Sequence, residues 1–247
     1  MTALRRILED QLVSFSHQMH SRQWVANHDG NISVRLLDGR FLATPTSVSK
    51  ATVSRENLIV VDDQGKVVSG SGKPFSELSL HLYIYRQRPD VQAVMHAHPP
   101  TATGFSVAGV PVRTTMMPEP VVSLGALVPL VPYAAPKKPE WTSGMGPHLA
   151  DADVLLLEHH GVISVGPDLE TAFLRMELVE HLAKIQIAAH QVGLVRDIPD
   201  SDIEALLEAR TKAGLGHAAR VTAALGAQGT DPIREMVVNE VSRALHR

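Results

Sequence analysis

Two histidines, His96 and His98, stand one residue apart at the end of the apolar run VMHAHPP. In a β-strand, residues i and i+2 project to the same face, with Cα atoms about 6.5–7 Å apart. Two imidazoles at that separation can bind one divalent ion at about 2.0–2.1 Å per bond. The same pattern also suits two polar residues that simply end a strand at the surface, so the pair alone leaves both interpretations open.

A second pair, His159 and His160, follows the apolar segment LLLE and precedes Gly161. Adjacent residues of a strand point to opposite faces, so only one of the two can join the first pair. We favour His160, because the neighbouring Gly161 lets backbone or ligand approach closely. His159 is then interpreted as a polar residue at the surface.

The acidic candidate is Glu77, in the segment KPFSELSLH, where the pattern predicts the first turn of a helix. The helix macrodipole favours an anion there, and the carboxylate can bind a metal or accept a proton. An ordinary glutamate that completes a helix cap is the alternative. His81, four residues further on, shares the helix face and is interpreted as a supporting or core residue. Three imidazoles and one carboxylate suit Zn²⁺ best, with Mn²⁺, Co²⁺ and Fe²⁺ as alternatives.

Composition limits the classes of protein to consider. The chain has 247 residues, no cysteine and a formal net charge of −3. This length can bury a full core without disulfides, and the lack of cysteine excludes a thiolate site. The charge and the missing basic stripe argue against a nucleic-acid partner. No apolar run reaches the ~18 residues of a membrane span, and residues 1–20 predict an amphipathic helix, not a signal peptide. We therefore expect a cytoplasmic protein with no membrane partner.

The elements that must position these side chains follow from periodicity and turn residues. Strict alternation of strand and helix is missing, which favours a mainly antiparallel sheet flanked by helices over a Rossmann fold. No change in composition divides the chain, so we expect one domain over 1–247, with a helical C-terminal extension from about 195. The predicted elements are hairpins over 27–46 and 57–72, a helix over 73–90, a strand over 91–100, a helix or loop over 101–109, strands within 152–166, and helices over 168–193, 199–212 and 230–246.

Five segments, GNISVR, TPTSVSK, GKPFSELSLH, HAHPPTAT and LLLEHHGVISVG, occur in the order and approximate spacing of the class II aldolase/adducin family. The chain resembles this family over roughly residues 5–190. The resemblance implies a three-layer α/β/α domain with a mainly antiparallel central sheet, and a homotetramer with sites at subunit interfaces. It also implies a divalent ion held by His96, His98 and His160, with Glu77 as fourth ligand and as acid/base.

In the family's sugar-phosphate aldolases, three segments hold a phosphate, and they correspond here to Gly30-Asn31, Thr46-Ser47 and Phe75-Ser76. Two of these positions depart from the family pattern. Ser47 replaces a glycine that commonly lets the backbone approach the phosphate. Phe75 replaces a small hydroxyl residue, cannot donate a hydrogen bond and would crowd a phosphate. These departures disfavour a phosphosugar substrate.

The same aldolases use tyrosines as proton donors, one about twenty residues past the first metal-binding histidine and one near the C-terminus. This chain has Met116-Met117 in the first stretch and no tyrosine after Tyr133. Decarboxylation and retro-aldol cleavage both pass through an enolate that a Lewis-acid ion stabilises. Decarboxylation needs only one proton delivered to carbon, which Glu77 can supply. An apolar lining of Phe75, Met116 and Met117 would suit a planar substrate.

We therefore expect a metal-dependent decarboxylase of a hydroxy-aromatic, dihydroxyphthalate-like acid or of a hydroxy-oxo-dienoate acid. The alternative is a class II aldolase that cleaves a hydroxy-ketone or a sugar-phosphate-like substrate. A non-catalytic interaction module, as in the adducin branch, and an isomerase or epimerase are the remaining classes. The missing basic tail and the complete set of histidines argue against the first, and Ser47 and Phe75 argue against the second.

A carboxylate substrate requires a counter-charge, for which Arg35, Lys50, Lys73 and Arg113 are candidates. Lys73 is favoured because it precedes Glu77 by four residues at the expected start of a helix, whose free N–H groups also bind carboxylates. A solvated surface charge is the alternative for each of them. The predicted substrate-binding residues are Asn31, Thr46, Ser47, Lys73, Phe75 and Ser76.

Overall fold

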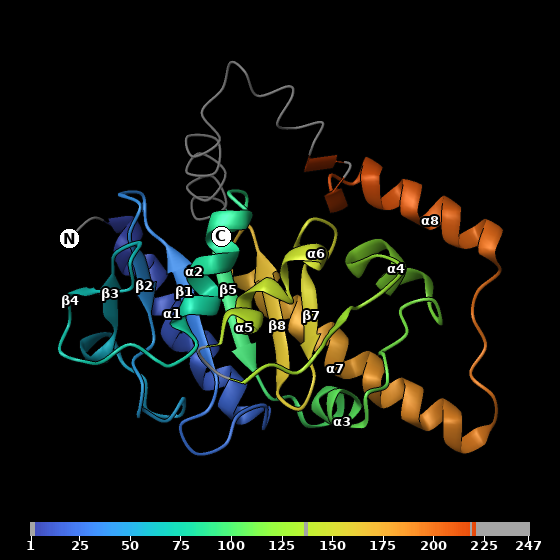
Figure 1. Ribbon diagram of the computed structural model, residues 1–247, viewed down its shortest axis with the longest axis horizontal. Coiled ribbons are helices and arrows are strands. Elements are labelled where there is room, and N and C mark those ends of the chain that lie inside the picture. Colours follow the sequence, from blue (N-terminus) through green and yellow to red (C-terminus); the bar gives the residue numbers. More distant parts are fainter. Residues whose placement is uncertain (1–2, 136–137, 218, 221–247) are drawn as a thin grey trace.

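One eight-stranded sheet organises the chain in the computed structural model, which describes residues 3–135, 138–217 and 219–220 (Figure 1). The strand order is β4-β3-β2-β1-β5-β8-β7-β6, and every neighbouring pair is antiparallel except β6 and β7. The strands are β1 Asn31–Arg35, β2 Phe41–Ala43, β3 Ile59–Val61, β4 Val67–Ser69, β5 Ala93–Ala97, β6 Leu130–Val131, β7 Val154–Leu157 and β8 Gly161–Gly166.

Helices cover both faces of this sheet, and Figure 1 shows α2, α5 and α6 over one face with α1 and α7 over the other. The helix α8 packs against α4 beyond the β6 end of the sheet. Besides a short 3₁₀ turn at Arg55–Asn57, the helices are α1 Ala3–Ser21, α2 Leu78–Gln87, α3 Pro100–Ala108, α4 Pro118–Leu124, α5 Pro139–Ser143, α6 Gly146–Leu149, α7 Leu169–Val192 and α8 Asp200–Lys212.

Alternation along the strands explains why two helical layers form. In β5, the side chain of Met95 packs into the core with α1, α3 and α7, whereas its neighbour Val94 packs into the core with α2, α5 and α6. Val162 and Ile163 of β8 divide in the same way. Because successive strand residues point to opposite faces, apolar strands of this kind must be covered on both sides. The expected α/β/α fold with a mainly antiparallel central sheet is confirmed.

The long helix α7 shows how local signals set element boundaries. Asp168 caps its N-terminus by accepting a hydrogen bond from the Thr171 backbone N–H at 2.6 Å, and Gly193 follows its last residue. These two residues bound the helix that the sequence predicts over 168–193. None of the helices among the described residues is long and apolar enough to span a membrane.

The predicted elements differ from the structure at one helix start and between residues 118 and 149, and one predicted helix lies outside the described residues. The helix predicted from residue 73 begins only at Leu78, so Glu77 is its N-cap residue and is not in its first turn. The sequence analysis missed α4, β6, α5 and α6, all between 118 and 149. The helix predicted over 230–246 falls outside the described residues.

Candidate functional site

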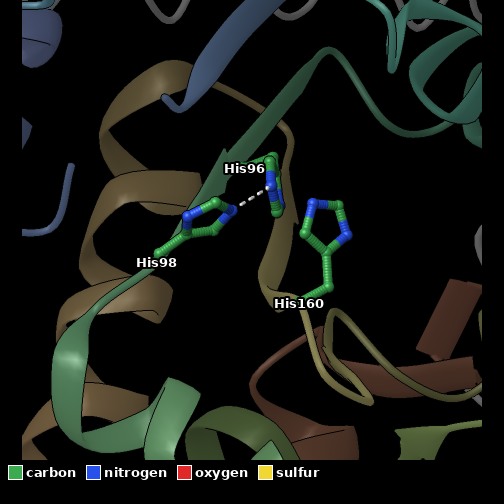
Figure 2. A group of neighbouring side chains, drawn as sticks. All are labelled: His96, His98 and His160. Carbon is green, nitrogen blue, oxygen red and sulfur yellow. Dashed lines mark hydrogen bonds between the residues drawn. The ribbon is translucent and has the colours of Figure 1, made fainter. Parts of the chain in front are cut away.

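Three histidines meet at one end of the central strands. His96 lies in β5, His98 follows the end of that strand, and His160 ends the turn between β7 and β8. Because β5 pairs with β8, these segments are brought side by side although 62 residues separate His98 from His160 in sequence. One ring nitrogen of each histidine lies within 4.8 Å of the others, and Figure 2 shows the three rings turned toward one another. The structure therefore brings together the three predicted ligands.

His96 has a defined orientation. Its Nδ1 lies 2.9 Å from the carbonyl oxygen of Val162 in β8, and a carbonyl can only accept, so the proton is on Nδ1. The Nε2 atom then carries the lone pair and faces the Nε2 atom of His98 at 3.1 Å. Burial lowers the pKa of His96 to about 3, which keeps its imidazole neutral. A neutral imidazole held through its other nitrogen is typical of a metal ligand.

Glu77 lies beside this cluster. Its Oε1 atom is 3.1 Å from Nε2 of His160, and its Oε2 atom is 3.6 Å from Nε2 of His96. The side-chain amide of Asn31 donates a hydrogen bond to Oε2 at 2.5 Å. Burial by itself would raise the pKa of Glu77, but His96, His160 and Asn31 together lower it well below its ordinary value. The carboxylate is therefore ionised, and its direction is fixed by Asn31.

Three imidazoles with one adjacent carboxylate form a donor set that a divalent ion can occupy. The orientation of His96 supports this, because its free Nε2 lone pair points toward the other ring nitrogens and not toward a hydrogen-bond donor of the backbone. Nitrogen donors combined with oxygen suit Zn²⁺. His81 is fully buried, and its Nδ1 lies 2.7 Å from the hydroxyl of Ser33, so it supports the sheet and does not join the cluster.

The turn at residues 158–160 distinguishes the two adjacent histidines. His159 has a positive φ of 56° and an exposed side chain, which lies edge-on to Tyr133 with ring centroids 5.9 Å apart. This left-handed conformation turns His160, and not His159, toward His96. Gly161 follows where the chain passes closest to β5.

A cavity of about 240 Å³ opens beside Glu77 and His160. Ser76 lines it, together with Val131–Ala134, Trp141 and the turn 158–160. The backbone N–H of Tyr133 donates to Oε2 of Glu158 at 2.8 Å, which joins two sides of the cavity. Tyr133, Trp141 and Glu158 were not predicted as site residues, because a residue in a loop, a turn or a helix as short as α5 carries no periodic signal.

The three apolar residues predicted to line the site do not line this cavity. Met116 and Met117 line a different cavity, together with Ile185, Ala189 and other residues at the end of α7. Phe75 is 7% exposed and packs into the core, with its ring 5.0 Å from that of His81. It therefore does not line this cavity.

The loop Thr46-Ser47 contains a residue in the left-handed backbone conformation that favours glycine. Ser47 is exposed with a φ of 60°, and the Thr46 backbone N–H donates to the carbonyl oxygen of Lys73 at 2.9 Å. Lys73 itself has an exposed side chain and precedes the start of α2 by five residues. The reason for favouring Lys73 as a counter-charge, a position at the start of a helix, is therefore wrong.

The other candidate counter-charges differ in their surroundings. The guanidinium of Arg35 lies 5.3 and 5.0 Å from the ring centroids of Phe41 and Tyr85 and donates to the backbone of Tyr85. Arg113 forms an ion pair with Asp197. Lys50 is only 1% exposed.

Comparisons with known proteins agree with this geometry. Residues 10–187 match the model of the family described as "Class II Aldolase and Adducin N-terminal domain". An L-fuculose phosphate aldolase of Methanococcus vannielii is 32% identical over 71% of this chain and 93% of that protein. A 3-oxo-tetronate 4-phosphate decarboxylase of Escherichia coli O6:H1 is 32% identical over 72% of this chain and 85% of that protein. The crystal structure of YgbL from Escherichia coli, titled a putative aldolase/epimerase/decarboxylase, superposes with a TM-score of 0.76 at 29% identity, over 83% of this chain and 99% of that chain.

Proposed function

Because this chain belongs to the class II aldolase and adducin family, we propose that it is a divalent-metal-dependent C–C lyase with His96, His98, His160 and Glu77 as ligands. The observation that carries this proposal is the meeting of three imidazoles with an ionised carboxylate 3.1 Å from His160. Relatives named as aldolase and as decarboxylase both support a lyase. Zinc is the proposed metal, with manganese, cobalt and iron as alternatives.

A bound divalent ion would supply Lewis-acid stabilisation of an enolate formed from the substrate. Val162 keeps the lone pair of His96 directed into the site through the hydrogen bond at Nδ1. Asn31 holds Oε2 of Glu77, which leaves Oε1 as the oxygen that exchanges a proton with substrate carbon. Ser76 and Trp141 line the cavity in which the rest of the substrate lies.

A carboxy-lyase is our preferred reaction, acting on a small carboxylate. Decarboxylation needs one proton delivered to carbon. Glu77 is ionised in the site, so it would relay a proton that it first accepts from water or a substrate hydroxyl, and the chain has no tyrosine after Tyr133. A hydroxy-aromatic or hydroxy-oxo-dienoate acid would pack its planar group against Trp141 and Tyr133. We further propose a homotetramer in which neighbouring subunits complete the sites.

An aldolase acting on a hydroxy-ketone or a sugar-phosphate-like substrate is the second candidate. The observation in its favour is the position of Phe75, which packs into the core and leaves Ser76 to line the cavity. The name of one relative contains a phosphorylated 3-oxo acid. Such a compound carries both a carboxylate and a phosphate, so it is included in the same assay.

The test is a panel assay of the purified protein loaded with Zn²⁺ or Mn²⁺. It follows release of CO₂ from hydroxy-aromatic, dienoate and phosphorylated 3-oxo acids, beside release of aldehyde from hydroxy-ketones. We expect CO₂ from at least one acid. Aldehyde without CO₂ would assign the second candidate, and neither product from a folded, metal-loaded protein would contradict a lyase.

Three variants separate the roles of the site residues. His96→Ala should lose bound metal, measured by elemental analysis. Glu77→Gln should keep metal but lose turnover by about 10²–10⁴-fold, as for a missing general acid. His159→Asn is the matched control for metal content, because asparagine tolerates the left-handed backbone of that position. Unchanged metal content in His96→Ala would defeat the ligand assignment.

A further inference from the structure

Lys50 is a buried cation that the proposed chemistry does not use. Its side chain is 1% exposed, and its Nζ atom donates to two backbone carbonyl oxygens, of Val48 at 2.9 Å and of His28 at 3.3 Å. These two carbonyls belong to different loops. The ammonium group therefore joins the loop before β1 to the loop after β2.

No carboxylate forms an ion pair with Lys50 within the part of the chain that the structure describes. Asp29 and Glu77 favour its charge only from a longer distance. The carboxylate of Asp29 instead lies 3.7 Å from Nδ1 of His98. A buried charge without an adjacent counter-charge is costly, and a bound anion reduces that cost.

The two loops joined by Lys50 lead directly to the candidate site. The first continues through Gly30, whose φ is 74°, to Asn31, whose amide donates to Glu77. The second contains Thr46 and Ser47, with Ser47 in the left-handed conformation.

We propose that Lys50 is the positioning residue for an oxyanion group of the substrate, holding both loops in place and supplying the positive charge beneath them. The inference rests on the proposed function, since it takes Asn31, Thr46 and Ser47 as substrate-binding residues. The oxyanion is a carboxylate or a phosphate, which share this chemistry. Lys50 acts by holding the two loops in place and by the electrostatic field of its ammonium group. The carbonyl oxygens that it binds are neutral, so they leave its charge uncompensated.

A merely structural role for Lys50 makes a different prediction. If Lys50 only ties the loops together, a neutral hydrogen-bond donor that preserves the fold would preserve anion binding too. If its charge is used, Lys50→Gln should weaken anion binding even when the protein stays folded, whereas Lys50→Arg should retain most of it.

The experiment measures binding of inorganic phosphate and of acetate to the zinc-loaded protein by calorimetry, with zinc content checked for every variant. For Lys50→Gln we expect both affinities to fall, the preferred anion by about tenfold, as for loss of one charge at short range in a protein. Lys66→Gln, at an exposed lysine after a surface turn, should leave both unchanged. Equal anion affinity in wild type and in folded Lys50→Gln would overturn the proposal. Preference of the wild type for phosphate or for acetate identifies the group.

A second measurement needs no neutral variant, in case Lys50→Gln fails to fold. Burial lowers the pKa of Lys50 to about 8, against the opposing effect of Asp29 and Glu77. Sulfate keeps its charge between pH 7 and 9.5, so its affinity for the wild type should fall as Lys50 loses its proton. Lys50→Arg stays charged over this range and should show a smaller decline. Identical pH profiles would overturn the proposal.

These outcomes are separable from those of the panel assay. Anion binding that depends on Lys50 in a protein without lyase activity would keep the inference and reject the function. Lyase activity together with an anion affinity and a KM that Lys50→Gln leaves unchanged would keep the function and reject the inference.

Discussion

Gly161 lies where the turn that carries His160 meets the strand that carries His96. A Cβ atom added at this position would lie 2.5 Å from the carbonyl oxygen of Ala97 and 2.6 Å from Cδ2 of His98. Both distances are shorter than real contacts, so Gly161→Ala must displace the backbone or the His98 ring. We expect a loss of about 1–3 kcal/mol in the free energy of unfolding. Zinc affinity should fall by about tenfold or more, in the range seen when a ligand loses its orientation.

The matched control is Gly104→Ala, in helix α3. No atom lies within 4 Å of a Cβ built at Gly104, and alanine is the better helix former, so stability should stay equal or rise by up to about 1 kcal/mol. Urea unfolding and zinc titration of both variants provide the measurement. Unaltered zinc affinity in Gly161→Ala would show that His98 does not depend on this close approach.

At the same scale, local patterns predicted which histidines meet but not how other side chains turn. Strand periodicity and the glycine after His160 are signals within a few residues of each ligand, and the structure brings those rings together. Phe75 and Lys50 depend on packing between loops that lie far apart in sequence. Their burial could therefore not be read from neighbouring residues, and the substrate preference inferred from Phe75 was weakened as a result.

At the scale of elements, Glu180 of α7 holds the N-terminus of α3, the helix that follows His98. Its buried carboxylate accepts hydrogen bonds from the backbone N–H groups of Thr101 and Ala102, at 3.0 and 2.8 Å to Oε2. Removing it in Glu180→Ala leaves these donors unsatisfied inside the protein. We expect a loss of about 2–3 kcal/mol in the free energy of unfolding, measured with urea.

Glu177 provides the comparison on the same helix. Its ion pair with Arg22 is partly exposed, with 35% of the Glu177 side chain accessible, so Glu177→Ala should cost at most about 1 kcal/mol. An equal effect of the two substitutions would mean that α3 is held by its apolar contacts and not by Glu180.

Element boundaries were predictable where capping residues were present and not elsewhere. The helix predicted over 168–193 agrees with α7, Leu169–Val192, because Asp168 caps its start and Gly193 follows its end. The start of α2 was placed too early, because Pro74 is compatible with a first helical turn but the chain stays irregular until Leu78. The short strand β6 has only two residues, too few for any periodicity to show.

At the scale of the whole molecule, one buried carboxylate connects parts of the chain that are distant in sequence. The side chain of Asp153 has no accessible surface and forms ion pairs with Arg88 at the end of α2, Arg175 of α7, Arg210 of α8 and Arg220, at 3.0, 2.9, 3.2 and 3.2 Å. Asp153→Asn would leave four largely buried guanidinium groups without their shared counter-charge. We expect the substitution to lower the free energy of unfolding by about 3–5 kcal/mol.

Asp90→Asn is the matched control, at a carboxylate that is 43% exposed and pairs with Arg88. It should lower the free energy of unfolding by about 1 kcal/mol or less.

This connection also predicts how stability changes in acid. Burial alone would raise the pKa of Asp153, but the surrounding arginines, Arg175 foremost, lower it below its usual value. A carboxyl group with a lowered pKa in the folded state stabilises the protein above its unfolded pKa of about 3.9, and the effect disappears as pH falls through the folded value. The stability difference between wild type and Asp153→Asn should therefore be constant from about pH 7 to 5 and shrink below about pH 4. A difference that stays constant down to about pH 3 would mean that the charge of Asp153 does not stabilise the protein, and that the substitution costs stability through hydrogen bonds that the amide cannot make.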